Sequence, residues 1–110
     1  QCSLCRLRQL ELLDAAHIIP DKEEKGLPII QNGIALCKIH HAAFDKNILG
    51  ISPDYIIHLR REILEEIDGP MLKYGLQSLE NMKINLPRNK INHPDRDLLA
   101  IRFSRFLNAG

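Results

Sequence analysis

The chain of 110 residues has 45% hydrophobic and 26% charged residues, a balance typical of one soluble globular domain. Its net charge is +1, so composition alone does not indicate a nucleic-acid-binding protein, although residues 81–110 are mildly basic, with six Lys or Arg against two Asp or Glu. No apolar run approaches the roughly 20 residues that span a bilayer, so we expect no membrane-spanning helix.

The first half of the chain predicts a hairpin followed by a short helix. Residues 1–8 are predicted to form a tight cysteine turn, and 10–19 an apolar strand that ends at a proline. After a charged surface loop, residues 32–37 begin with an Asn-Gly turn signal and continue as a second strand. Residues 38–47 have the composition of a short helix.

The second half predicts another hairpin and two helices. Residues 48–64 place a Ser-Pro-Asp turn between two apolar runs, which favours a hairpin over the whole range. A helix is predicted to restart at Pro70, residues 83–94 are predicted to be extended, and 94–110 give the clearest helix signal. The apolar stripe of this last helix is expected to pack in the core; it comprises Leu99, Phe103, Phe106 and Leu107.

Three cysteines and one histidine occur as two pairs with the same spacing. Cys2 and Cys5 are separated by two residues, as are Cys37 and His40. Two such turns can close a tetrahedron around one ion, and three thiolates with one imidazole form an established structural zinc set. The alternatives are a redox dithiol or free thiols for the first pair, and a buried cysteine beside a surface histidine for the second. An odd cysteine count rules out a fully paired disulfide framework and favours a reducing compartment, so a cytoplasmic protein is expected.

A second group of polar residues points to hydrolytic chemistry. His41 and Asp45 are four apart, so on a helix they share one face and could bind a divalent ion while leaving positions open for water and substrate. His17, at the end of the first strand, is placed to act as a general base, and Asn32 could hydrogen-bond across the loop that follows it. The alternatives are an ordinary His–Asp surface pair, a half-buried histidine and a turn asparagine.

The segments AAHIIP and NGIALCKIHHAAFD resemble the HNH family of endonucleases, which belong to the ββα-metal nucleases. The three letters of the family name fall on His17, Asn32 and His41. This resemblance implies an α+β fold with a ββα-metal core over residues 2–51. It also implies a zinc knuckle, followed by a hairpin and helical C-terminal cap over residues 52–110. The segments DGPML and HPDRDLLAIRFSRF are similar to the C-terminal ends of HNH domains in bacterial restriction enzymes.

The resemblance also implies a role for each residue. His17 would activate the attacking water, His41 and Asp45 would bind a catalytic Mg²⁺ or Mn²⁺, and Asn32 would hold the loop that orients His17. The expected reaction is metal-dependent hydrolysis of DNA phosphodiester bonds, as the cleavage module of a bacterial restriction or defence enzyme. Because the chain starts abruptly at Gln1, we expect it to be part of a longer polypeptide that carries a target-recognition domain; a homodimer is a further expectation.

One departure from the family pattern leaves alternative functional hypotheses open. Many HNH enzymes have an Asp or His ligand directly before the base histidine, whereas this chain has Ala16. Either waters complete the coordination, or Asp14 on the same strand face assists. One alternative hypothesis is a zinc-stabilised DNA-binding module that no longer cuts, and another is an RNA nuclease. His58 and His93 have no partner at a useful spacing and are expected to be surface residues.

Overall fold

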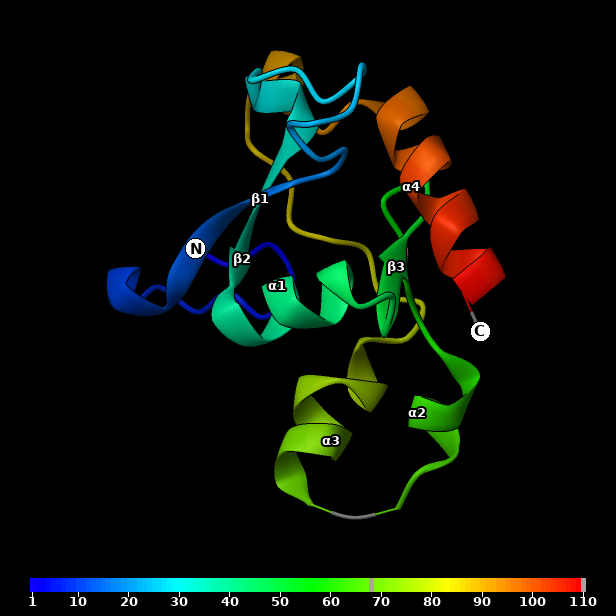
Figure 1. Cartoon of the computed structure of the whole chain (residues 1–110). Helices are drawn as coiled ribbons and strands as arrows, with labels where there is room; N and C mark the ends of the chain where they lie inside the picture. The colour runs from blue at the N-terminus through cyan, green and yellow to red at the C-terminus, as the bar shows by residue number, and fades with distance from the viewer. Residues whose placement is uncertain (68, 110) are drawn as a thin grey trace.

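The computed structural model describes residues 1–67 and 69–109, and its first half is a hairpin that leads directly into a helix (Figure 1). Strand β1 (Leu13–His17) pairs antiparallel with β2 (Gly33–Cys37), with Ala15 opposite Ala35. Helix α1 (Lys38–Asp45) begins where β2 ends, because the Cys37 sulfur accepts a hydrogen bond from the backbone N–H of His40 and so caps the helix. Strand, strand and helix therefore follow one another as predicted. The first strand is shorter than the predicted range 10–19, because Leu10–Leu12 form a 3-10 helix and the strand ends at His17.

A second hairpin follows, but it is shorter than predicted. Strands β3 (Leu49–Ile51) and β4 (Ile57–Leu59) pair antiparallel, and the predicted strand beyond residue 59 is instead helix α2 (Arg61–Glu65). The prediction over residues 60–64 was wrong because the apolar pattern indicates neither a contact with a distant segment nor an ion pair within one helical turn. The Leu59 N–H donates to the Glu80 carboxylate, and Arg61 pairs with Glu65 at 2.7 Å across one helical turn.

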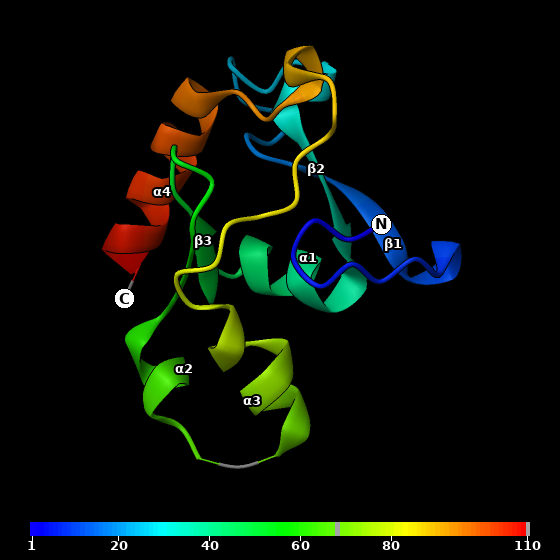
Figure 2. The ribbon, with the colours of Figure 1, turned by 180° about the vertical axis from the view of Figure 1, so that it is seen from behind.

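Helix α3 (Pro70–Gly75) begins at the predicted proline, and the chain then returns along the back of the first hairpin (Figure 2). This returning segment bonds to the N-terminal turn, where the Asn85 backbone N–H and side-chain amide both donate to the Ser3 carbonyl. The predicted extended stretch 83–94 is interrupted by a 3-10 turn at Lys90–Asn92. The segment thus connects the C-terminal half of the chain to the N-terminal turn.

Helix α4 (Arg96–Ala109) starts two residues later than predicted. The reason is that Asp95, rather than Pro94, caps it: one Asp95 carboxylate oxygen accepts the N–H groups of Asp97 and Leu98. The helix packs on β3, where Gly50 is required because a side chain there would meet the ring of Phe106 at 2.5 Å.

One core lies between the first hairpin, α1, the second hairpin and α4. Among the described residues, the largest side chains that are essentially inaccessible to solvent are Phe44, Ile18, Ile19, Leu36, Leu49, Ile51, Ile57 and Leu99. Leu107 was expected in this core but is 64% exposed, whereas Phe106 is buried. Among the described residues, no helix has the length and apolar character needed to cross a membrane. The mixed architecture with two small antiparallel sheets confirms the predicted α+β fold.

Candidate metal centre and hydrolytic site

Four residues predicted as ligands converge at the junction of the N-terminal turn and α1. The ligand atoms of Cys2, Cys5, Cys37 and His40 all lie within 4.8 Å of one another. The His40 Nδ1 atom is 3.6 Å from the Cys2 sulfur and 3.3 Å from the Cys37 sulfur, and the Cys5 and Cys37 sulfurs are 4.0 Å apart. Around a tetrahedral Zn²⁺ with bonds of about 2.3 Å, sulfur atoms lie about 3.8 Å apart. The group can therefore hold a metal ion such as zinc.

The surroundings of His40 fit metal binding as well. Its Nε2 atom lies 2.6 Å from the Gly75 carbonyl, which can only accept, so Nε2 carries the proton and the Nδ1 lone pair faces the cysteines. The backbone around residues 2–7 forms the predicted tight turn, with Arg6 N–H bonded to the Cys2 carbonyl and Arg6 at φ 65°.

The thiols differ in how readily they ionise. Burial opposes ionisation of Cys2. When no ion is bound and His40 also carries a proton on Nδ1, hydrogen bonds from His40 and from backbone amides lower the pKa of Cys2 to about 6. Burial, together with the neighbouring charges on Cys2 and Cys37, raises the pKa of Cys5 to about 12. A dication among the sulfurs would offset this repulsion, so the cluster has the chemistry of a cation site.

Asn32 is fully buried and spans the loop between β1 and β2. Its side-chain oxygen accepts the Ile19 N–H at 2.9 Å, and its amide group donates to the Ile19 and Leu27 carbonyls, both at 3.0 Å. The expected Asn-Gly turn is absent at this point of the described chain, because Asn32 ends a 3-10 helix (Ile30–Asn32) and Gly33 is extended, with φ −131°. Asn32 therefore fixes the backbone two residues beyond His17.

His17 stands at the exit of β1 with its side chain 46% exposed. Its Nε2 atom lies 3.0 Å from a carboxylate oxygen of Asp21. Sequence reasoning placed Asp21 in a plain surface loop and missed this contact, because a four-residue spacing carries no meaning outside a helix. The loop can fold back in this way because Gly26 lies against the Pro20 carbonyl, where any side chain would clash at 1.8 Å.

His41 lies between two carboxylates, one at each ring nitrogen. Its Nδ1 atom is 2.9 Å from Asp14, and its Nε2 atom is 3.2 Å from Asp45. Asp14 also pairs with Lys38 at 2.8 Å, and His41 and Lys38 together hold the pKa of Asp14 below its usual range. Assistance from Asp14 was one of two alternatives for completing the coordination of the ion beside Ala16. The structure instead places Asp14 on the far ring nitrogen, away from Asp45.

The geometry at His41 fits a divalent ion. Both ring nitrogens face carboxylate oxygens, which only accept. When the single proton of the neutral ring lies on Nδ1 and is donated to Asp14, the Nε2 lone pair is free to share an ion with Asp45. Two ligands on one octahedral ion are about 3 Å apart, close to the separation of Nε2 and the Asp45 oxygen. Among the described residues, the Cys3His cluster is the one group of three or more such side chains close enough to share an ion. An ion at His41 and Asp45 would thus keep several waters.

An open hollow of about 490 Å³ brings together residues that the sequence predicted to carry out hydrolysis. His17, His41 and Asp45 all line it, although they come from β1 and α1. Two arginines of α4, Arg102 and Arg105, also line the hollow, and sequence reasoning missed both. The available signal was Arg102 itself, a charged residue on the same helical face as Leu99 and Phe106.

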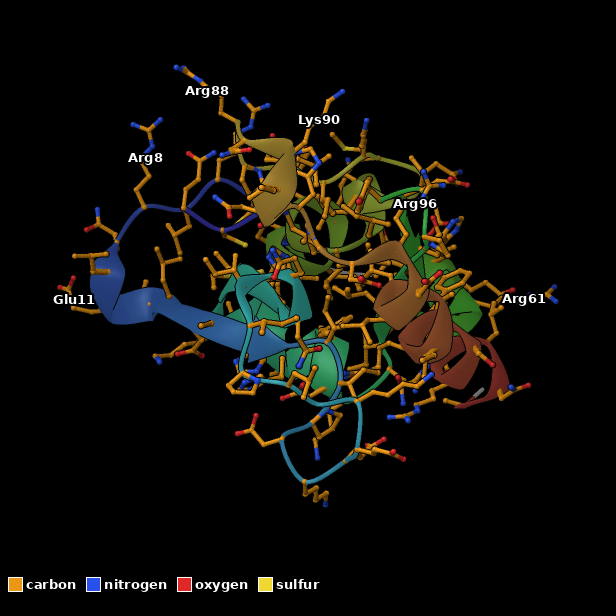
Figure 3. The ribbon with its side chains drawn as sticks, turned by 90° about the horizontal axis from the view of Figure 1, so that it is seen from above. Arg8, Glu11, Arg61, Arg88, Lys90 and Arg96 are labelled. Atoms are coloured by element: carbon orange, nitrogen blue, oxygen red, sulfur yellow. The ribbon has the colours of Figure 1, made fainter. Side chains whose placement is uncertain are left out.

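Arg102 and Arg105 are the basic residues of the C-terminal segment that line this hollow, and other basic residues of the segment lie elsewhere. Arg88 and Lys90 project together with Arg8 from another edge of the molecule (Figure 3). The two remaining histidines are partly exposed, but each has a partner that the sequence did not indicate. His58 lies 3.4 Å from Glu80 and packs on Phe103, while His93 Nε2 donates to the Pro87 carbonyl at 2.7 Å.

Known proteins resemble this chain in one sequence segment and in fold. Residues 2–52 match the family model described as HNH endonuclease, which confirms the resemblance read from the sequence. A solved structure titled "Modification dependent TagI restriction endonuclease" is similar in fold, with a TM-score of 0.66 and 21% identity. The match covers 99% of this chain but 34% of that one, so the chain spans about a third of that protein's length. A search of curated proteins gives no match. Together the findings show a segment similar to HNH endonucleases and a fold shared with part of a restriction endonuclease.

Proposed function

We propose that the protein is a metal-dependent endonuclease module that hydrolyses DNA phosphodiester bonds. The observation that carries the proposal is the shared hollow, onto which a histidine with a free ring nitrogen and a His–Asp pair both open. The Cys3His cluster would hold a structural zinc ion. The protein of similar fold is described as a modification-dependent restriction endonuclease, which supports a restriction role with target recognition elsewhere in a longer protein.

Each residue has a distinct task in the proposed reaction. Asp21 accepts the Nε2 proton of His17, which leaves the Nδ1 lone pair to take a proton from the attacking water. Asn32 keeps the backbone after His17 in place. His41 and Asp45 would hold Mg²⁺ or Mn²⁺, which suits a site of one imidazole and one carboxylate. When bound, that ion supplies charge stabilisation at the phosphate and leaving oxygen.

The rival function is a module that binds DNA without cutting it. The observation that favours it is Ala16, which is 1% exposed and occupies the position where many HNH enzymes carry a ligand. A supercoiled-plasmid assay separates the two functions. We expect nicks in Mg²⁺ or Mn²⁺, rapid arrest by EDTA with the fold retained, and recovery when either ion is added back. DNA retained in a gel shift without nicks in either ion would favour the binder.

Asp14 should tune the affinity of the catalytic ion. Removing the acceptor on Nδ1 frees His41 to rotate or change tautomer, and loss of such a partner typically weakens metal binding about 10- to 100-fold. We expect this loss for Asp14→Ala, measured as Mn²⁺ affinity by electron paramagnetic resonance on zinc-loaded protein. Asp14→Asn keeps an accepting oxygen, so its Mn²⁺ affinity should fall between that of wild type and that of Asp14→Ala. Wild-type affinity in Asp14→Ala would show that Asp14 does not orient His41.

A further inference from the structure

Arg102 occupies a position that charged side chains avoid. It belongs to α4, far outside the segment that matches the HNH family model, and its side chain is 10% exposed. Burial lowers the pKa of its guanidinium, and the Asp45 carboxylate opposes that effect. A buried guanidinium is costly unless its N–H groups are satisfied, so its partners indicate why the position holds an arginine.

Those partners lie on the two elements that carry the hydrolytic residues. One terminal nitrogen, Nη1, donates to the Ile18 carbonyl at 2.7 Å and reaches the His17 carbonyl at 3.4 Å. The other, Nη2, donates to the Phe44 carbonyl at 2.9 Å. The guanidinium carbon also lies 4.1 Å from the centre of the Phe44 ring. One planar group therefore bridges the exit of β1 and the last turn of α1.

Arg102 also acts on the carboxylate proposed to bind the ion. Its Nη2 atom is 3.6 Å from Oδ1 of Asp45, while Oδ2 of Asp45 faces His41 Nε2 at 3.2 Å. Arg102 thus contacts one carboxylate oxygen of Asp45, and the other oxygen remains available to bind the proposed ion. Because both terminal nitrogens already face acceptors within the protein, Arg102 has little donor capacity left for a DNA phosphate.

We propose that Arg102 is a positioning residue that holds the base on β1 and the ion ligand on α1 at a fixed separation. This inference rests on the proposed nuclease function and extends it: α4 becomes part of the catalytic apparatus rather than only a cap. Catalysis is sensitive to such spacing, since a displacement of about 1 Å can cost about 100-fold in rate. Lysine cannot replace the bridge, because its single ammonium lacks the planar fork.

The test compares Arg102→Lys with wild type and with Arg96→Gln. Arg96 is a suitable control because it lies in the first turn of the same helix, pairs with Asp54 at 2.6 Å and projects outward (Figure 3). Each protein is first melted, so that activity is measured where all are folded. We expect Arg102→Lys to lose about 100-fold in kcat with KM for DNA little changed, and to bind Mn²⁺ more weakly. Arg96→Gln should match wild type in all three.

Each other outcome is decisive. A folded Arg102→Lys protein with wild-type kcat and Mn²⁺ affinity overturns the proposal. A raised KM with kcat retained would make Arg102 a DNA contact instead, and an unfolded Arg102→Lys protein at 25 °C would make it a general stability residue. If wild type does not cut at all, the proposed nuclease function fails. The Mn²⁺ measurement then still reports separately whether Arg102 orders the Asp45 site.

Discussion

Removing the metal ion from the Cys3His cluster should unfold the domain and not merely inactivate it. Zinc binding in small zinc domains contributes about 10–16 kcal/mol, comparable with or larger than the net stability of about 5–15 kcal/mol of a typical domain. The cluster joins segments that are distant in sequence: Cys2 and Cys5 anchor the N-terminal turn, Cys37 caps α1, and His40 bonds to Gly75 at the end of α3. Loss of the ion would release all of them.

The measurement is circular dichroism during treatment with 1,10-phenanthroline, followed by addition of Zn²⁺ or Mg²⁺. We expect loss of helical signal, recovery with Zn²⁺ and none with Mg²⁺. Cys37→Ser is an informative variant, because serine keeps the helix cap but removes the thiolate, so it should also fail to fold stably. About one equivalent of zinc should copurify with wild type. A metal-free protein that melts cooperatively at the wild-type temperature would refute the assignment.

The ββα core could be predicted because its signals are local. The strand over Leu13–His17, the strand that ends at Cys37 and helix α1 follow from apolar runs and a proline a few residues away. The cysteine and histidine spacings predicted the cluster for the same reason, since tight turns present side chains at fixed offsets. Helix α3 could also be predicted, because Pro70 fixes its own φ angle at a value that suits the first turn of a helix.

The remaining features depend on contacts between distant segments. Nothing near Arg102 indicates that it reaches carbonyls some 58 and 84 residues away along the chain. The contact of Asp14 with the far nitrogen of His41 depends on how α1 lies on β1, which strand parity alone does not define. Similarly, β4 ends where Glu80 accepts its last N–H group, and the local pattern predicted a longer strand.

His17→Ala should nearly abolish cutting while leaving the fold intact. A general base contributes about 100- to 10,000-fold to rate, and its contribution arises in the transition state rather than in substrate binding. The His17 side chain is half exposed and pairs with Asp21 at the surface, so its removal should alter the free energy of unfolding by less than about 0.5 kcal/mol. DNA affinity should likewise change little.

His93→Ala provides the matched control. It also removes a histidine, but His93 and its partner Pro87 are not among the residues that line the hollow. The most direct measurement is the single-turnover rate of DNA cleavage in saturating Mg²⁺ for wild type, His17→Ala and His93→Ala, each shown to be folded and zinc-loaded. We expect a loss of at least about 100-fold for His17→Ala and a wild-type rate for His93→Ala. A folded His17→Ala protein that cuts at the wild-type rate would contradict this expectation.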